Sequence, residues 1–241
     1  MSGDLVEDQY PASDDASSTD AAPASSTIGA GWRGRLEAEP TVMVLLRHGV
    51  TDNTVRRLFC GSGGSDPGLN AEGHEQAARA AAWITRHHRV DAIVSSPLQR
   101  TQDTAAHVAE ATGLDVTLEE GVAEAAFGDW DGHTFVEIME RWPDEMVAWL
   151  DSTAVAPPGG ETFDAVYERV VAARDRLVQT YAGQTVVITS HVTPIKMMVR
   201  HALGAPMSAI HALELAPASI STVVWWPDAL PSVRNFSVVP E

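Results

Sequence analysis

The sequence predicts an α/β domain built as a three-layer sandwich, in which a mostly parallel sheet is covered by helices on both faces. Short apolar runs at residues 42 to 46, 91 to 96 and 185 to 190 have the length and composition of buried strands. Longer segments whose apolar residues recur at helical spacing separate these runs. Strands that alternate with helices form parallel sheets, because each crossover needs an element that runs back along the sheet.

The first predicted helix spans residues 71 to 88, where alanines and Ile84 recur on one face. A second helix is predicted at residues 98 to 113. It should end at Gly113, because glycine readily adopts the left-handed conformation found at helix ends. A short strand is expected directly afterwards, at residues 115 to 118.

The second half of the chain continues the alternation. Residues 135 to 150 have helical character interrupted by Pro143, which cannot donate the backbone hydrogen bond of a helix interior. A long amphipathic helix is predicted at residues 161 to 181, and a shorter one at residues 194 to 204. The apolar segments STVVWW and VRNFSVV are predicted to close the domain as strands.

Residues 1 to 40 are expected to be a disordered acidic tail in front of a domain at residues 41 to 241. The tail is rich in Ser, Ala and Asp, and it has too few bulky apolar residues to offset the entropy of ordering. It does not resemble a secretory signal, and no run of about 18 apolar residues occurs in the chain. We therefore expect a cytoplasmic protein without a membrane partner.

Charge and residue usage narrow the possible partners. A net charge of −17 is unfavourable for sequence-independent nucleic-acid binding, which depends on neutralising phosphates with Lys and Arg. Lys196 is the only lysine, so other phosphate-binding cations must be Arg or His. Cys60 is the only cysteine, which excludes an internal disulfide. The sequence is compatible with either a monomer or a homodimer.

Polar residues follow the three buried strands at the point where each strand ends. Arg47 and His48 follow the first, Arg100 lies just after the second, and His191 follows the third. The carboxyl ends of parallel strands meet at one edge of a sheet, where ligands of such sheets gather. Two guanidinium groups and two imidazoles at one edge form a pocket suited to an oxyanion such as a phosphate group.

This set of groups indicates phosphoryl transfer. A neutral imidazole can attack phosphorus to give a phosphohistidine, which water then cleaves, while the flanking cations stabilise the transferring group without a metal. The departing alkoxide needs a proton, and Glu124 is the best-placed carboxylic acid. Other carboxylates nearby in the sequence are alternatives to it: Glu119, Glu120, Asp129 and Glu161.

Four segments resemble the histidine phosphatase superfamily. In LLRHGVT, the resemblance implies that His48 is phosphorylated and that Arg47 binds phosphate. SSPLQRTQDTA is similar to the second phosphate-binding segment of the family and carries Arg100. EAAFGDWDG resembles the segment with the acid, here Glu124, and SHVTPIK resembles the segment with the second histidine, here His191.

The resemblance covers residues 41 to 226 and implies a phosphoglycerate mutase-like fold. It is closest to the acid phosphatase domain that follows a ribonuclease H domain in some actinobacterial proteins, and to the α-ribazole phosphatases. Many members have Glu at the position of Val50 and Asn at that of Thr54. Asn53 and Thr54 are therefore candidate substrate-binding residues in which this chain departs from the family.

We expect a metal-independent histidine acid phosphatase that hydrolyses a small-molecule phosphate ester. His48 attacks while Arg47, Arg100 and His191 hold the phosphoryl oxygens, and Glu124 acts first as acid and then as base. No cofactor is needed. Two alternatives remain: a mutase of the phosphoglycerate type, which returns the phosphoryl group to its product, and a non-catalytic module that only binds phospholigands.

Overall fold

The computed structural model describes residues 39 to 241, so the predicted tail lies outside the described residues except for its last two positions. A sheet of six strands forms the centre, in the order β3-β2-β4-β1-β5-β6. Pairing is parallel among the first four of these strands, whereas β5 is antiparallel to β1 and β6 is antiparallel to β5. The strands are β1 (Thr41–Arg47), β2 (Ala92–Ser95), β3 (Val116–Leu118), β4 (Thr185–Ser190), β5 (Ile220–Trp226) and β6 (Ala229–Val238).

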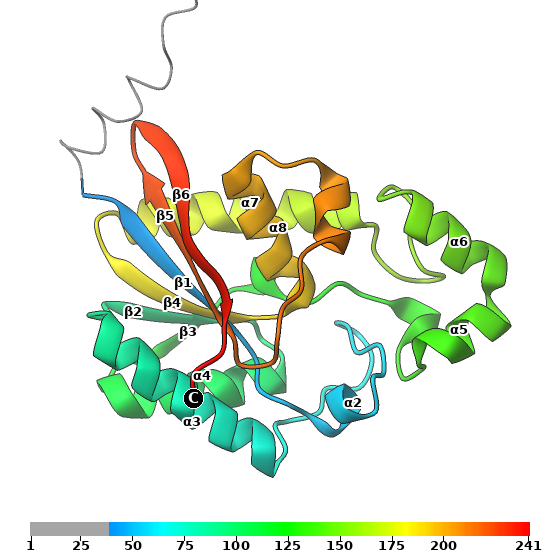
Figure 1. Ribbon diagram of the computed structural model, residues 1–241, viewed down its shortest axis with the longest axis horizontal. Coiled ribbons are helices and arrows are strands. Elements are labelled where there is room, and N and C mark those ends of the chain that lie inside the picture. Colours follow the sequence, from blue (N-terminus) through cyan, green and yellow to red (C-terminus); the bar gives the residue numbers. More distant parts are fainter. Residues whose placement is uncertain (1–38) are drawn as a thin grey trace, which may run out of the picture.

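Helices cover both faces of the sheet, as the sequence predicts (Figure 1). The long helices are α3 (Ala71–His87), α4 (Gln99–Thr112), α7 (Phe163–Thr180) and α8 (Val192–Leu203). Shorter ones are α2 (Asp52–Val55), α5 (Phe135–Arg141), α6 (Pro143–Asp151), and the 3-10 turns η1 (Glu120–Val122), η2 (Gly128–Trp130) and η3 (Met207–His211). No helix among residues 39 to 241 is both long and apolar enough to cross a membrane.

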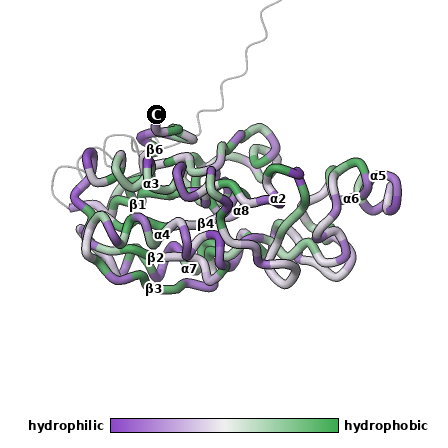
Figure 2. Tube along the Cα trace, turned by 90° about the horizontal axis from the view of Figure 1, so that it is seen from below, coloured by the Kyte–Doolittle hydropathy of each residue, from purple (hydrophilic) through white to green (hydrophobic). Residues whose placement is uncertain are grey.

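Successive side chains of β1 enter two separate cores, because side chains alternate between the faces of a strand. Met43 and Leu45 pack with the core under α7 and α8, whereas Val44 and Leu46 pack with the core under α3 and α4. All four side chains are fully buried. Hydrophobic colours accordingly run through the strands in Figure 2. A strand held from both sides fixes the position of the residues that follow it.

The breaks predicted from glycine and proline are confirmed. Gly113 ends α4 in the left-handed conformation, with φ of 74°. Pro143 is the first residue of α6 and separates it from α5, which ends at Arg141. The pair α5 and α6 lies beyond the carboxyl end of the sheet, at the far end of the molecule from β3 (Figure 1).

The segment after β1 lies very close to the start of α3. A Cβ atom placed on Gly49 would lie 2.4 Å from the carbonyl oxygen of Gly73, so only glycine fits there without a shift of the backbone. The short helix α2, which the sequence did not reveal, begins directly afterwards at Asp52 and is capped by Thr51. Its four residues are too few to give a periodic apolar pattern.

Candidate active site

The polar residues predicted at the strand ends do converge. Arg47 is the last residue of β1 and pairs in register with Ser190, the last residue of its parallel neighbour β4. His48 and His191 therefore come next on adjacent strands, and their ring centroids lie 5.3 Å apart. Arg100, in the first turn of α4 after β2, donates from Nε to Nδ1 of His191 at 3.2 Å.

His48 is held as a neutral imidazole with one free nitrogen. Its Nδ1 lies 2.7 Å from the carbonyl oxygen of Gly49, and that oxygen can only accept, so Nδ1 carries the proton and Nε2 keeps its lone pair. Its backbone N–H donates to the carbonyl of Ser190 at 3.0 Å. Burial, and next the positive charges of Arg47 and Arg100, hold the pKa of His48 well below its ordinary value. His48 is thus a fixed imidazole that keeps one unprotonated nitrogen at neutral pH.

His191 is completely buried, and both of its ring nitrogens are engaged. Nδ1 accepts from Arg100, so the proton of the neutral ring lies on Nε2, which donates to Oγ of Ser96 at 2.8 Å. Burial, followed by the positive charge of Arg100, holds the pKa of His191 well below its usual range. The ring therefore orients the Arg100 guanidinium in the present arrangement.

The two arginines carry hydrogen-bond donors that no described residue uses. Arg47 donates from Nη1 to the carbonyl of Leu215, but its buried Nε has no acceptor. Arg100 donates from Nη2 to the carbonyl of Cys60 at 3.0 Å, and its buried Nη1, 3.5 Å from Oδ1 of Asp66, makes no hydrogen bond. Buried donors without acceptors are costly, so these groups favour an added anion.

Burial is also the main influence on the charge of Arg47. Burial lowers the pKa of Arg47, Glu124 opposes that shift and Arg100 adds to it, so that the pKa is about 10. A group with that pKa still carries its positive charge at neutral pH. Arg47 therefore remains available as a cation beside His48.

Glu124 is buried and reaches the same region from the segment between η1 and η2. Its Oε1 accepts from the backbone N–H of Ala125 at 2.9 Å and lies 3.3 Å from the backbone nitrogen of Thr193, in the first turn of α8. The carboxyl group of Glu124 is thus held in place at the first turn of α8.

A clamp that the sequence did not reveal holds this segment. Arg169 of α7 donates from Nη2 to the backbone carbonyl of Glu124 at 2.9 Å and from Nη1 to that of Ala123 at 2.8 Å. Glu161, one of the alternative acids, pairs with Arg169 at 3.0 Å and accepts from the N–H of Ala126. Burial acts to raise the pKa of Glu161, but its hydrogen bonds with Arg169 and Ala126 together leave that pKa lowered. Glu161 therefore supports the acid-bearing segment.

These groups open onto a cavity of about 440 Å³. Of the residues proposed from the sequence, Arg47, His48, Thr54, Arg100 and Glu124 line it. The buried His191 lies behind this wall. Asn53 does not line the cavity, because its amide donates to Sγ of Cys60 and Oγ of Ser65.

Sequence reasoning missed several lining residues: Arg57, Phe127, Trp149, Phe163, Lys196 and His211. A signal existed for one of them. Lys196 comes three residues after Thr193 on the helix that follows the His191 motif, so both side chains share one helix face. The others come from segments distant in sequence. Within residues 39 to 241, no cluster of three or more His, Cys, Asp or Glu side chains could hold a metal ion.

The fold and this site define an α/β domain in which two buried histidines and two arginines meet at the carboxyl ends of parallel strands. Residues 43–236 match the family model of the histidine phosphatase superfamily (branch 1). The chain belongs to this superfamily, as its motifs predicted.

Two curated relatives and one solved structure illustrate the similarity. A bifunctional protein of Mycobacterium tuberculosis is 42% identical over 235 residues, which are 95% of this chain and 64% of that protein. The chain thus spans less than two thirds of the length of that relative. Phosphoserine phosphatase 1 of Hydrogenobacter thermophilus is 34% identical over 183 residues, 75% of this chain and 85% of that enzyme.

One structural neighbour is the α-ribazole phosphatase of Shigella flexneri, with 25% sequence identity and a TM-score of 0.73. The match covers 82% of this chain and 96% of that chain. The predicted phosphoglycerate mutase-like architecture and the resemblance to α-ribazole phosphatases are confirmed.

Proposed function

We propose that this chain is a phosphomonoesterase that hydrolyses a small-molecule phosphate ester through a phosphohistidine at His48. One observation carries the proposal: His48 is a buried, neutral imidazole whose Nδ1 donates to the carbonyl of Gly49 and leaves Nε2 free, and it lines a cavity together with Arg47, Arg100 and Glu124. Membership of the histidine phosphatase superfamily and the phosphatase names of its relatives support the same reaction.

In the first step, Nε2 of His48 donates its electron pair to phosphorus while the bond between phosphorus and the ester oxygen breaks. Glu124, in its acid form, gives its proton to the departing oxygen, so that a neutral alcohol leaves. The phosphorylated ring is positively charged, and its Nδ1–H remains hydrogen-bonded to the carbonyl of Gly49. Arg47 and Arg100 stabilise the charge on the phosphoryl oxygens.

In the second step, the Glu124 carboxylate takes a proton from water as the water oxygen attacks phosphorus. The phosphorus–nitrogen bond breaks, its electrons return to Nε2, and inorganic phosphate leaves. Glu124 thereby recovers its proton and the cycle closes. His191 acts through Arg100 in this scheme. It can also donate to a phosphoryl oxygen if its Nε2–H turns away from Ser96.

We further propose that the reaction needs no metal and works in mildly acidic solution. Arg47 and Arg100 supply the positive charge that a metal would otherwise provide. The low pKa of His48 keeps its nucleophilic form populated below pH 6.5, where an ordinary histidine becomes protonated. We also propose a cytoplasmic site of action, which agrees with the free thiol of Cys60.

The test is to trap the intermediate. Wild-type protein mixed with a phosphate ester and quenched in base should carry a phosphoryl group on the peptide that contains His48. His48→Ala should lose that adduct and at least about a thousandfold in kcat, because the nucleophile itself is removed. His74→Ala is the matched control, since His74 is exposed on α3 and contacts His107.

Undiminished hydrolysis by His48→Ala would contradict the mechanism. Interconversion of phosphoglycerates faster than release of phosphate from any ester would instead identify a mutase. EDTA should leave the rate of hydrolysis unchanged, because side chains supply the positive charge. Inhibition by EDTA that Mg²⁺ reverses would contradict metal independence.

A further inference from the structure

The cavity contains more positive charge than one phosphoryl group requires. Four basic side chains line it, Arg47, Arg57, Arg100 and Lys196, and among the described lining residues only Glu124 is a carboxylate. Arg47 and Arg100 match the charge of a phosphate monoester, which is between −1.5 and −2, roughly, at neutral pH. Two cations then remain without an anionic partner, in a chain whose net charge is −17. Such a local excess indicates a second anionic group on the substrate.

Lys196 is the better placed of these two cations. It is half-buried on α8, one turn beyond Thr193, whose backbone nitrogen lies beside Glu124. Its Nζ donates to the carbonyl of Ile210 at 3.0 Å, and no carboxylate of the described chain forms an ion pair with it. An ammonium group has three N–H donors, so two remain for the two oxygens of a carboxylate.

The groups around Lys196 agree with the binding of an anion beside its Nζ. Burial lowers its pKa, and Arg47 lowers it further, whereas Glu124 and Glu214 act in the opposite direction. An anion bound beside Nζ would replace the water that burial has removed.

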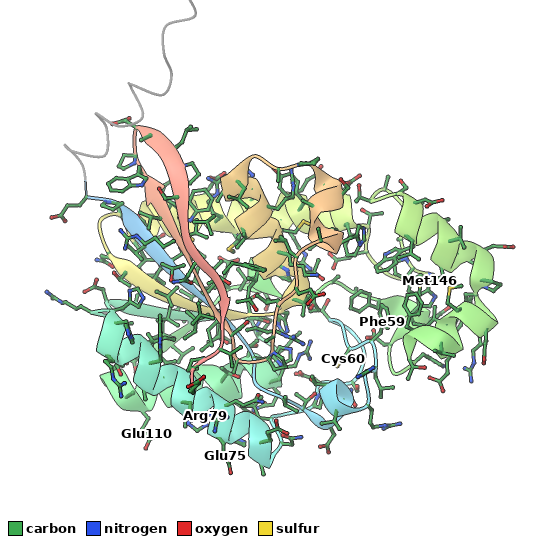
Figure 3. All side chains as sticks on the ribbon, viewed as in Figure 1. Phe59, Cys60, Glu75, Arg79, Glu110 and Met146 are labelled. Carbon is green, nitrogen blue, oxygen red and sulfur yellow. The ribbon has the colours of Figure 1, made fainter. Side chains whose placement is uncertain are left out.

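The neighbouring wall of the cavity is aromatic. Trp149 packs against Phe163 with ring centroids 4.9 Å apart, and the His211 ring lies 6.5 Å from that of Trp149. His211 follows Ile210, the residue that accepts from Lys196, so the cation and this wall adjoin. Phe127 lines the same cavity and packs edge-on against Phe59, at 5.0 Å. Phe59 lies near the α5–α6 end of the molecule in Figure 3.

We propose that the alcohol part of the substrate is amphipathic: a flat apolar body lies against Trp149 and Phe163, and a carboxylate on it pairs with Lys196. This inference rests on the proposed function, because it assumes that the phosphoryl group occupies Arg47 and Arg100. The cavity of about 440 Å³ has room for such a group in addition to the phosphoryl group. Lys196 is then a specificity-determining residue.

Arg57 strengthens the positive field at the same cavity. It is exposed, its guanidinium has no hydrogen bond or ion pair with the described residues, and its backbone adopts the left-handed conformation with φ of 56°. That conformation is unfavourable for a residue with a Cβ atom. Strain of this kind is concentrated at ligand sites, which agrees with a role for Arg57 near the substrate.

Two matched esters test the proposal: 4-carboxyphenyl phosphate and 4-methylphenyl phosphate, which share a ring and a phosphoryl group. The measured quantity is the ratio of their kcat/KM values, in the wild type and in variants. Comparing this ratio between proteins cancels the intrinsic reactivity of the two esters. Lys196→Gln should lower the ratio by about 10- to 100-fold, the effect of losing a charged hydrogen-bonded partner.

The variants separate charge from structure. Lys196→Gln keeps an N–H donor for the carbonyl of Ile210, and Lys196→Arg keeps the charge and should retain most of the wild-type ratio. Arg79→Gln is the control for a general change in net charge. Arg79 pairs with the exposed Glu75 on α3, neither residue lines the cavity, and both are labelled in Figure 3. This control should leave the ratio as it is in the wild type.

Each outcome decides between the proposals. If Lys196→Gln slows both esters equally, Lys196 has only a structural role and the inference fails. If the wild type hydrolyses the methyl ester but rejects the carboxylate ester, the inference fails and the proposed function stands. If well-folded wild-type protein hydrolyses neither ester nor any other phosphate ester, the proposed function fails and the inference fails with it.

Discussion

The two ends of the cavity are built in different ways. At the reactive end, Arg47 and His48 continue a strand that is packed from both faces, and hydrogen bonds fix their side chains. At the other end, Trp149 comes from α6 and Arg57 from the segment after α2, both of them short elements. In the proposed mechanism the reacting groups thus follow the strands of the sheet. Short elements beside the sheet, together with Phe163 of α7 and Lys196 of α8, surround the alcohol part of the substrate. Changes at the first end should alter kcat, and changes at the second should alter the choice of substrate.

The largest effect that tests this comparison is expected from Glu124→Gln. The amide cannot exchange the proton that the leaving alcohol needs, so kcat should fall by about 10²- to 10⁴-fold. The loss should be smaller for 4-nitrophenyl phosphate, whose leaving group needs little protonation, than for an alkyl phosphate. Steady-state kinetics on both esters will measure it. Equal losses on the two esters would show that Glu124 is not the general acid.

The reactive end should also make the fold sensitive to acid. His48 and His191 have pKa values well below 6.5 in the folded protein, so below pH 6.5 the unfolded chain binds protons that the native state does not. The free energy of unfolding is therefore highest above pH 6.5, as far as these two histidines determine it. It falls as the pH decreases towards the pKa values of the folded state. The expected slope is about 1.4 kcal/mol per pH unit for each histidine. Urea unfolding between pH 7 and pH 5 will measure the slope. His48→Asn should reduce the slope by the contribution of one histidine, about 1.4 kcal/mol per pH unit.

A smaller effect is expected at the clamp that supports the acid. Arg169→Met removes the donors to the backbone carbonyls of Ala123 and Glu124, so the carboxylate should lose its fixed position. We expect kcat to fall by about tenfold, with little change in KM, since misplacement of a catalytic group slows the reaction. Arg176→Met is the control, because Arg176 is an exposed residue that pairs with Glu119. A similar decrease in both variants would exclude a specific role for the clamp.

The smallest effect is expected at Thr54. Thr54→Val removes a hydroxyl group at the cavity wall that also caps α2 by accepting from the backbone N–H of Thr51 at 3.3 Å. It should raise KM by about two- to fivefold, the effect of losing one neutral hydrogen bond. Asn53→Ala should raise KM less, because its amide contacts Cys60 and Ser65 in the structure. Initial-rate measurements on one ester will compare the two. A larger rise for Asn53→Ala would show that the amide turns towards the substrate.

The residues at the reactive end of the cavity can be predicted from the sequence more fully than those at the other end. Strand ends are marked in the sequence by an apolar run that stops at a polar residue, so the sequence alone places Arg47, His48 and His191 at one edge of the sheet. Glu124 is predicted from its position on a connecting segment, and in the structure it lines the cavity. Glu161, one of the alternative acids, instead forms an ion pair with Arg169.

Other contacts could not be predicted, because they join segments that no periodicity connects. Arg169 reaches Glu124 across 45 positions of sequence, and its place on an amphipathic helix looks like that of any half-exposed arginine. Trp149 and Phe163 become neighbours only when the segment between α6 and α7 folds back. Asn53 and Thr54 are adjacent in sequence, yet the turn of α2 directs only Thr54 to the cavity.

Chemical modification of the single lysine can show whether a ligand occupies the cavity. Apart from the amino terminus of the chain, Lys196 provides the only primary amine, and that amine lines the cavity. Because its pKa is lowered, more of it is in the nucleophilic free-base form at mildly alkaline pH than for an ordinary lysine. An amine-directed reagent will therefore acylate one side chain, and a ligand that fills the cavity will shield that side chain from the reagent.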